Sequence, residues 1–171
     1  MKRLSAVLAA VSSALDRACL WVSLAAFIVM LLAILLQVVA RYVFAMPPTW
    51  TDELARYAMI WGAMPGAAMS YARGVDPVLK RPDCTGRPGL ALAIQAIEGT
   101  AMFAFILPVL WYMPGFLERH AHRITESLEI NSAVVVAIVP ASLVVVLVHM
   151  LSRLAKCVLA CQELKARESK V

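Results

Sequence analysis

The stretch RYVFAMPPTWTDELARYAMIWGAMPG, residues 41–66, decides how the chain is organised. It begins where a long apolar run ends, and it passes through two adjacent prolines at positions 47 and 48. Because proline removes a backbone donor and clashes with the helical turn before it, the first helix is expected to end here. Thr49 is expected to cap a new helix with Asp52 in its first turn. The stretch therefore predicts a turn that joins two helices.

The composition around this stretch is that of a membrane protein. Of the 171 residues, 62% are hydrophobic and only 16% are charged, whereas about a quarter of a soluble domain is charged. The apolar residues lie in long blocks, which predicts an all-α polytopic protein with one membrane domain over residues 1–171. The net charge of +5 comes without a basic, aromatic-rich polar surface, so nucleic-acid binding is excluded.

Four transmembrane helices are expected. About 20 apolar residues at 1.5 Å each cross the ~30 Å hydrocarbon core. The expected spans lie at about residues 19–40, 57–72, 90–113 and 133–151.

Three further segments are expected to lie outside the spans. An amphipathic lead-in precedes the first span, and an amphipathic interfacial helix at about residues 49–57 precedes the second. The polar segment between the third and fourth spans favours a short surface helix.

The distribution of cations predicts the orientation of the chain. Twelve Lys and Arg residues fall in segments 1–18, 73–89 and 152–171, on one side of the expected spans. Four fall on the other side. Because cytoplasmic loops carry the excess of positive charge, both termini are predicted to be cytoplasmic.

The residue types needed for cofactor or redox chemistry are not arranged for it. The four cysteines form no CxxC pair, so neither a redox site nor a metal site is indicated. His149 has no second histidine at its own level to serve as the other axial ligand of a haem. We therefore expect no cofactor, no metal and no enzymatic activity.

Three polar side chains interrupt the apolar blocks: Gln37, Gln95 and Glu98. Glu98 lies about eight residues into the third expected span, roughly 12 Å along the helix. An ionisable residue in a membrane span can line a transport path, or it can hold its helix to another helix or subunit through hydrogen bonds. The second interpretation is favoured, because no other ionisable residue lies at a similar depth.

The helix that follows the prolines carries a charged first turn and an aromatic face. Asp52 and Glu53 suit the positive end of a helix dipole, and Arg56 lies within ion-pair reach of both. Trp50, Leu54, Tyr57 and Trp61 recur at helical spacing on one face. The pattern fits an ordinary interfacial aromatic belt, or a surface that binds a partner.

The order of these features resembles a known family. An apolar span ending in RYVF, then a proline turn, then WTDELARY and WG is similar to the small membrane subunit of tripartite ATP-independent periplasmic (TRAP) transporters, the DctQ-like family. The resemblance is strongest over residues 37–66. By this resemblance the signature positions, which are candidates for a partner interface, are Arg41, Trp50, Asp52, Glu53, Arg56 and Trp61.

The resemblance implies a small permease, or scaffold, subunit in the bacterial inner membrane. Its implied partners are a large membrane subunit, which carries the substrate and sodium sites, and a periplasmic substrate-binding protein that docks on the complex. The implied activity of the whole is sodium-coupled symport of an organic acid. Two alternatives stay open: a scaffold or assembly subunit of another membrane complex, and a homo-oligomeric transporter or channel that uses Glu98.

Overall fold

The structure, a computed structural model, describes residues 2–46, 48–75 and 88–168. These residues form four α-helices, which confirms the prediction of an all-α chain. Three of the helices contain segments long and apolar enough to cross a membrane, namely Val7–Val43, Ala93–Ala121 and Ser132–Val158. The helices are α1 (Lys2–Val43), α2 (Trp50–Arg73), α3 (Pro88–Ala121) and α4 (Ser132–Glu168).

Each helix is longer than the span expected from hydropathy. The lead-in is continuous with α1, and the polar C-terminal segment continues α4 to Glu168. The interfacial helix and the second span are a single helix, α2, rather than two elements. Most of the loop expected between the second and third spans lies outside the described residues.

The start of α2 differs from the expected capping. Thr49 adopts helical backbone angles, and its side chain makes no capping hydrogen bond. Instead the Thr51 hydroxyl donates to the carbonyl of Pro48 at 2.7 Å. Thr51 is fully buried, so the hydroxyl that secures this turn points into the protein. Thr49 thus occupies the predicted N-cap position, but the predicted side-chain capping bond is not formed.

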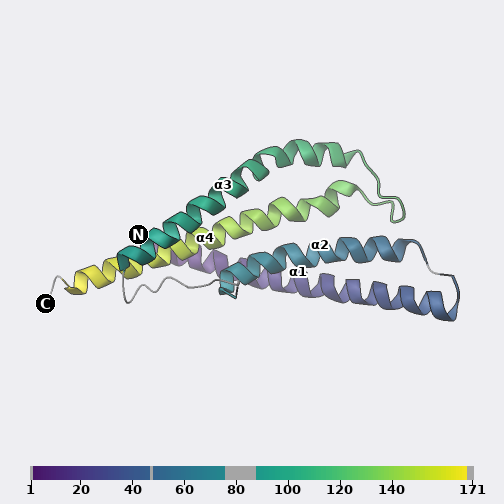
Figure 1. Ribbon diagram of the computed structural model, residues 1–171, viewed down its shortest axis with the longest axis horizontal. Coiled ribbons are helices and arrows are strands. Elements are labelled where there is room, and N and C mark those ends of the chain that lie inside the picture. Colours follow the sequence, from purple (N-terminus) through teal and green to yellow (C-terminus); the bar gives the residue numbers. More distant parts are fainter. Residues whose placement is uncertain (1, 47, 76–87, 169–171) are drawn as a thin grey trace.

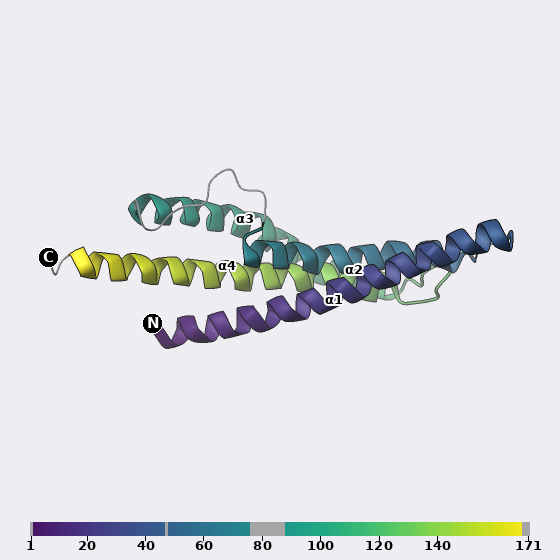
Figure 2. The ribbon, with the colours of Figure 1, turned by 90° about the horizontal axis from the view of Figure 1, so that it is seen from below.

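The four helices run antiparallel to their chain neighbours, with both termini at one end of the molecule (Figures 1 and 2). We call this the terminal end. The α1–α2 and α3–α4 connections lie at the opposite end, which we call the loop end (Figure 1). Residues at the start of α2 and in the α3–α4 connection, far apart in sequence, therefore share one end of the molecule.

The hairpin of α1 and α2 is closely packed because small and polar residues meet at its centre. The Ser23 hydroxyl donates to the carbonyl of Gly62 at 2.9 Å, and this bond is buried. A Cβ added at Gly62 would lie 3.1 Å from the Phe27 ring, so any larger residue here would have to displace that ring. Small residues at helix contacts are the usual means of association in membranes.

Helix α3 packs against α4 and contacts neither α1 nor α2. The contact is tight near the terminal end, where a Cβ at Gly99 would lie 3.4 Å from Leu154 and 3.8 Å from Met150. Ile106 is also buried, but no residue from position 107 to position 121 is. The second half of α3 therefore has no fully buried residue, and Figure 1 shows α3 arching away from α4 before it turns back toward it near the α3–α4 connection.

Two prolines lie in this half, Pro108 and Pro114. Each removes a helical hydrogen bond and bends its helix. These bends account for the curved course of α3 beside α4 (Figure 1).

Candidate functional site

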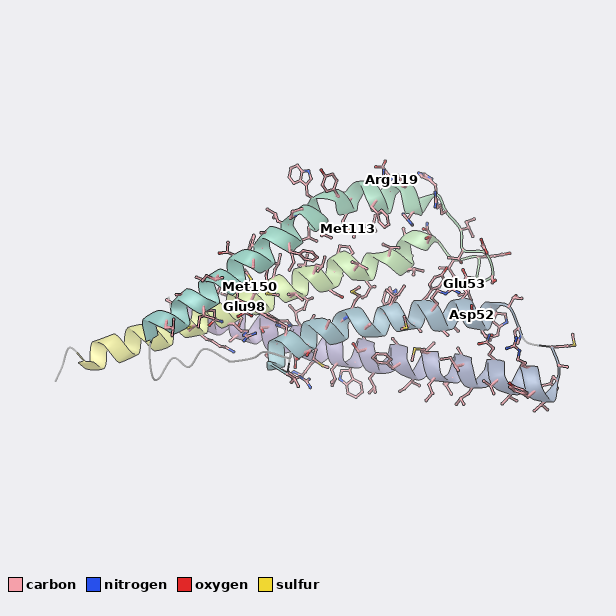
Figure 3. The ribbon with its side chains drawn as sticks, in the orientation of Figure 1. Asp52, Glu53, Glu98, Met113, Arg119 and Met150 are labelled. Atoms are coloured by element: carbon pink, nitrogen blue, oxygen red, sulfur yellow. The ribbon has the colours of Figure 1, made fainter. Side chains whose placement is uncertain are left out.

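The carboxylate of Glu53 joins the two connections at the loop end. One oxygen accepts the Tyr57 hydroxyl at 2.6 Å. The other accepts the backbone N–H groups of Ser127 and Leu128 at 2.8 and 3.0 Å. Glu53 belongs to the first turn of α2, whereas Ser127 and Leu128 belong to the α3–α4 connection (Figure 3). One side chain thus fixes a loop 74 residues further along the chain.

The loop that Glu53 holds is itself ordered by short bonds rather than by the surface helix expected from sequence. The N–H of Thr125 donates to the carbonyl of Ile130, and the N–H of Ile130 donates to the Thr125 hydroxyl, both at 2.9 Å. Ile124 and Asn131 form an isolated antiparallel bridge. These bonds close a compact turn whose N–H groups point at Glu53.

The hydrogen bonds keep Glu53 ionised. The Tyr57 hydroxyl lowers the pKa of this carboxyl most, and the N–H groups of Ser127 and Leu128 lower it further, against the opposing effect of desolvation. A carboxyl with a lowered pKa in the folded state stabilises that state above its ordinary pKa of about 4.3. This attachment is therefore complete at neutral pH and is lost only as the pH falls through the lowered value.

The other charged residues of the signature face solvent. Arg56 donates to Asp52 at 3.0 Å, the predicted i, i+4 pair, and both side chains are about two-thirds exposed. Such an exposed pair stabilises a helix only slightly. Arg41 is exposed at the end of α1, and Trp50 is 39% exposed at the start of α2.

The aromatic face of α2 lines a groove rather than facing away from the protein. Leu54, Tyr57 and Trp61 lie along one side of an apolar groove of about 410 Å³. Val22 of α1 and Val134 of α4 lie on its other walls. The expectation that these α2 residues share a face is confirmed for three of the four; Trp50 does not line the groove.

Three polar contacts link α1, α2 and α4 at the terminal end. Arg73 of α2 binds Asp16 of α1 through two guanidinium nitrogens, at 3.0 and 3.1 Å. Arg153 of α4 lies over the ring of Tyr71 of α2, 4.5 Å from its centre. It also donates to the Tyr71 carbonyl at 3.4 Å. The Arg73–Asp16 pair therefore links α2 to α1, and the contacts of Arg153 with Tyr71 link α4 to α2.

The third link joins α1 to α4. The Ser12 hydroxyl lies 2.7 Å from Nδ1 of His149, and His149 is only 1% exposed. At the terminal end, polar contacts therefore join each pair of the three helices. We call the set of six residues the terminal ring: Ser12, Asp16, Tyr71, Arg73, His149 and Arg153.

The three intramembrane polar residues do not meet. Gln95 is buried on the side of α3 that packs on α4, and Gln37 is half-buried on α1. Glu98 is half-buried and lies beside Met150 (Figure 3). Its neighbour Gly99 meets Leu154, so Glu98 lies at the height of the terminal ring. Within the described chain, Glu98 has no hydrogen-bond or ion-pair partner.

No arrangement for metal chemistry is found in the described part of the chain, where no group of three His, Cys, Asp or Glu side chains could hold an ion. The interactions that sequence reasoning missed are inter-helical. The ion pair between Asp16 and Arg73 did have a signal in the sequence, because Asp16 is the one acidic residue among the first 40. The backbone partners of Glu53 carried no signal in the sequence, because any residue supplies an N–H.

Replacing Glu53 by alanine should release the α3–α4 loop. We expect the amides of Ser127 and Leu128 to exchange with deuterium at least about tenfold faster in Glu53→Ala, because both N–H groups lose the carboxylate oxygen that accepts them and hydrogen bonds to a charged acceptor are the stronger ones. The measurement is hydrogen exchange by mass spectrometry on the protein in detergent. Asp52→Ala is the matched control, since Asp52 binds only the exposed Arg56. Equal protection in both variants would contradict the role of Glu53.

Replacing Ser12 by alanine should weaken the terminal ring. The change removes the hydrogen bond to the buried His149, and we expect a loss of about 0.5–2 kcal/mol, the range for polar contacts between membrane helices. Thermal unfolding followed by tryptophan fluorescence measures it. Ser13→Ala is the control, because Ser13 is exposed and donates only to the carbonyl of Ala10 in its own helix. A loss of stability that is the same in both variants would rule out a special role for Ser12.

Comparison with known families agrees with this geometry. The family model for the DctQ component of tripartite ATP-independent periplasmic transporters matches residues 30–160. The matched region contains all of α2 and α3 and most of α4. Comparison with curated proteins gives no significant match. The family is a transporter component family rather than an enzyme family, and the chain belongs to it: this is a DctQ component of a TRAP transporter.

Proposed function

We propose that the chain is the small permease subunit that, with a large membrane subunit and a periplasmic substrate-binding protein, imports an organic acid by sodium-coupled transport. The observation that carries this proposal is the family match over residues 30–160. The chain supplies the scaffold: it holds the large subunit in the inner membrane, and the residues that select substrate and sodium belong to the partners.

In this proposal α2 is a fourth membrane span, and both termini are cytoplasmic. The 24 residues of α2 extend about 36 Å at 1.5 Å each, enough to cross the hydrocarbon core. Arg73 and Arg153, which belong to cation-rich segments of the sequence, make their contacts at the terminal end, which suits the cytoplasmic side. The terminal ring then lies at the cytoplasmic boundary, and Glu53 lies at the periplasmic boundary.

The periplasmic surface then has two parts held as one. The exposed Asp52–Arg56 pair at the start of α2 forms the first part, and the α3–α4 loop, with Arg123 and Glu126 exposed, forms the second. Glu53 bonds the second part to the first. A surface ordered in advance binds a partner at a lower entropic cost, so this is where we place the docking of the substrate-binding protein. Of the six signature residues, Glu53 then supports docking by ordering this surface, and it does not itself contact the substrate-binding protein.

Purification of the chain with its proposed partners tests the function. The tagged chain is expressed together with the large membrane subunit, and both are extracted in mild detergent. We expect the large subunit to co-purify with the tagged chain on an affinity column. Sodium-driven uptake in liposomes should need both membrane subunits and the substrate-binding protein. Elution of the chain alone would overturn the scaffold role, and sodium-driven uptake by the chain alone would favour a self-sufficient transporter.

A further inference from the structure

A stripe of residues along the flank of α3 combines hollows with unpaired charges. Five residues recur at intervals of three and four, which is the spacing of a helix-packing seam. Their side chains line two apolar hollows: one of about 420 Å³ between α3 and α4, which Leu143 and Val146 of α4 also line, and one of about 360 Å³ on α3 itself. We call these residues the α3 seam: Met102, Phe105, Val109, Tyr112 and Phe116.

The α3 seam has a carboxylate at one end and a guanidinium at the other. Glu98 is four residues before Met102, and Arg119 is three residues after Phe116 and lines the second hollow. Figure 3 shows them at opposite ends of α3. Twenty-one residues of helix separate them by about 31 Å, close to the thickness of the hydrocarbon core. Neither has a hydrogen-bond or ion-pair partner in the described chain.

The rest of the described chain covers this stripe only in part, because Met102, Val109 and Phe116 are half-buried. The buried residues of α3, Gln95, Gly99 and Ile106, face α4, whereas Phe105 and Tyr112 are 72% and 76% exposed. Arg153, which lies near the height of Glu98, is engaged by Tyr71 of α2 instead. The charge at each end of the α3 seam is therefore available to a partner.

From the charges at the two ends we propose that the α3 seam seats a transmembrane helix of the large membrane subunit, with a cationic side chain opposite Glu98 and a carboxylate opposite Arg119. This inference rests on the proposed function for the presence of a second membrane subunit. The seam residues and their order come from this chain alone. The partner helix contributes apolar side chains to the two hollows, each of which exceeds the ~150 Å³ that accommodates a benzene ring.

Charge and composition favour a protein helix over lipid. The inner leaflet carries anionic lipids, which would repel Glu98 at the cytoplasmic boundary, whereas a Lys or Arg of a partner would pair with it. The exposed face of α1 is mostly aliphatic, with Leu31, Leu32 and Leu35 on it, as suits contact with acyl chains. The α3 seam has three aromatic residues among five, and aromatic residues are enriched where proteins meet.

Site-specific photo-cross-linking tests the seam directly. The photoreactive residue p-benzoylphenylalanine replaces Phe105, Tyr112 or Trp111, one position at a time. Each variant is expressed together with the large subunit, and membranes that contain both are irradiated. Trp111 is the matched control, because it is 81% exposed and adjoins Tyr112 but lies about 100° further round the helix. We expect adducts to the large subunit from positions 105 and 112, at least fivefold stronger than from position 111.

The outcomes separate this inference from the proposed function. If the large subunit co-purifies with the wild-type chain but cross-links mainly from position 111, the seam is wrong and the function stands. Adducts to a second copy of the chain, or to lipid alone, would also overturn the seam. Failure of the wild-type chain to co-purify with the large subunit would overturn both.

The end charges have a separate test. Glu98→Gln should lower the yield of co-purified large subunit by about two- to fivefold, the range for a partly exposed ion pair. Glu98→Lys should lower it by about tenfold or more, because like charges would then face each other. Glu118→Lys is the control, since Glu118 is exposed on another face of α3. Equal yields from Glu98→Lys and Glu118→Lys would contradict a cation opposite Glu98.

Discussion

The arrangement of this protein depends on polar contacts between its helices. Burial of apolar side chains alone would not hold these helices together. Lipid tails are as apolar as leucine, so a membrane helix gains little from leaving lipid for another helix. Close packing and inter-helical hydrogen bonds must therefore supply most of the free energy that holds the helices together. The chain has them at three levels: the terminal ring at one end, the Ser23–Gly62 bond at the centre of the α1–α2 hairpin, and the Glu53 carboxylate at the loop end.

These contacts divide the molecule into two parts. Helices α1, α2 and α4 are joined pairwise by the terminal ring, and Glu53 extends the connection to the loop that enters α4. Helix α3 takes no part in the ring and touches only α4. A scaffold subunit needs both parts, because a fixed frame sets the position in the membrane and an uncovered helix offers contact to a partner.

Sequence reasoning recovered what depends on periodicity and local spacing. It predicted the all-α class, the Asp52–Arg56 pair and the family. It failed where tertiary contacts decide. Thr49 has the residue type and the position of a cap, but its helical backbone angles leave the side chain without a capping bond. Hydropathy underestimated the length of every helix, because polar helical turns beyond an apolar span do not raise the hydropathy of the sequence.

The functional residues show the same limit. Glu53 was predicted from its place in the signature, yet its partners are backbone groups 74 and 75 residues away, which no spacing rule can identify. Glu98 was placed deep in the third span by counting from the start of an apolar run. Its neighbour Gly99 packs beside Leu154 of α4, and its depth in the bilayer stays a prediction.

The central claim is that three helices form the frame and the second half of α3 is left for a partner. Double electron–electron resonance between spin labels at Ala63 on α2 and Trp111 on α3, in a cysteine-free chain in lipid nanodiscs, tests it most directly. The account predicts a separation well beyond the 8–10 Å of directly packed helix axes, with a narrower distribution when the large subunit is present. A short distance in the isolated chain, with α3 packed against α2, would contradict it.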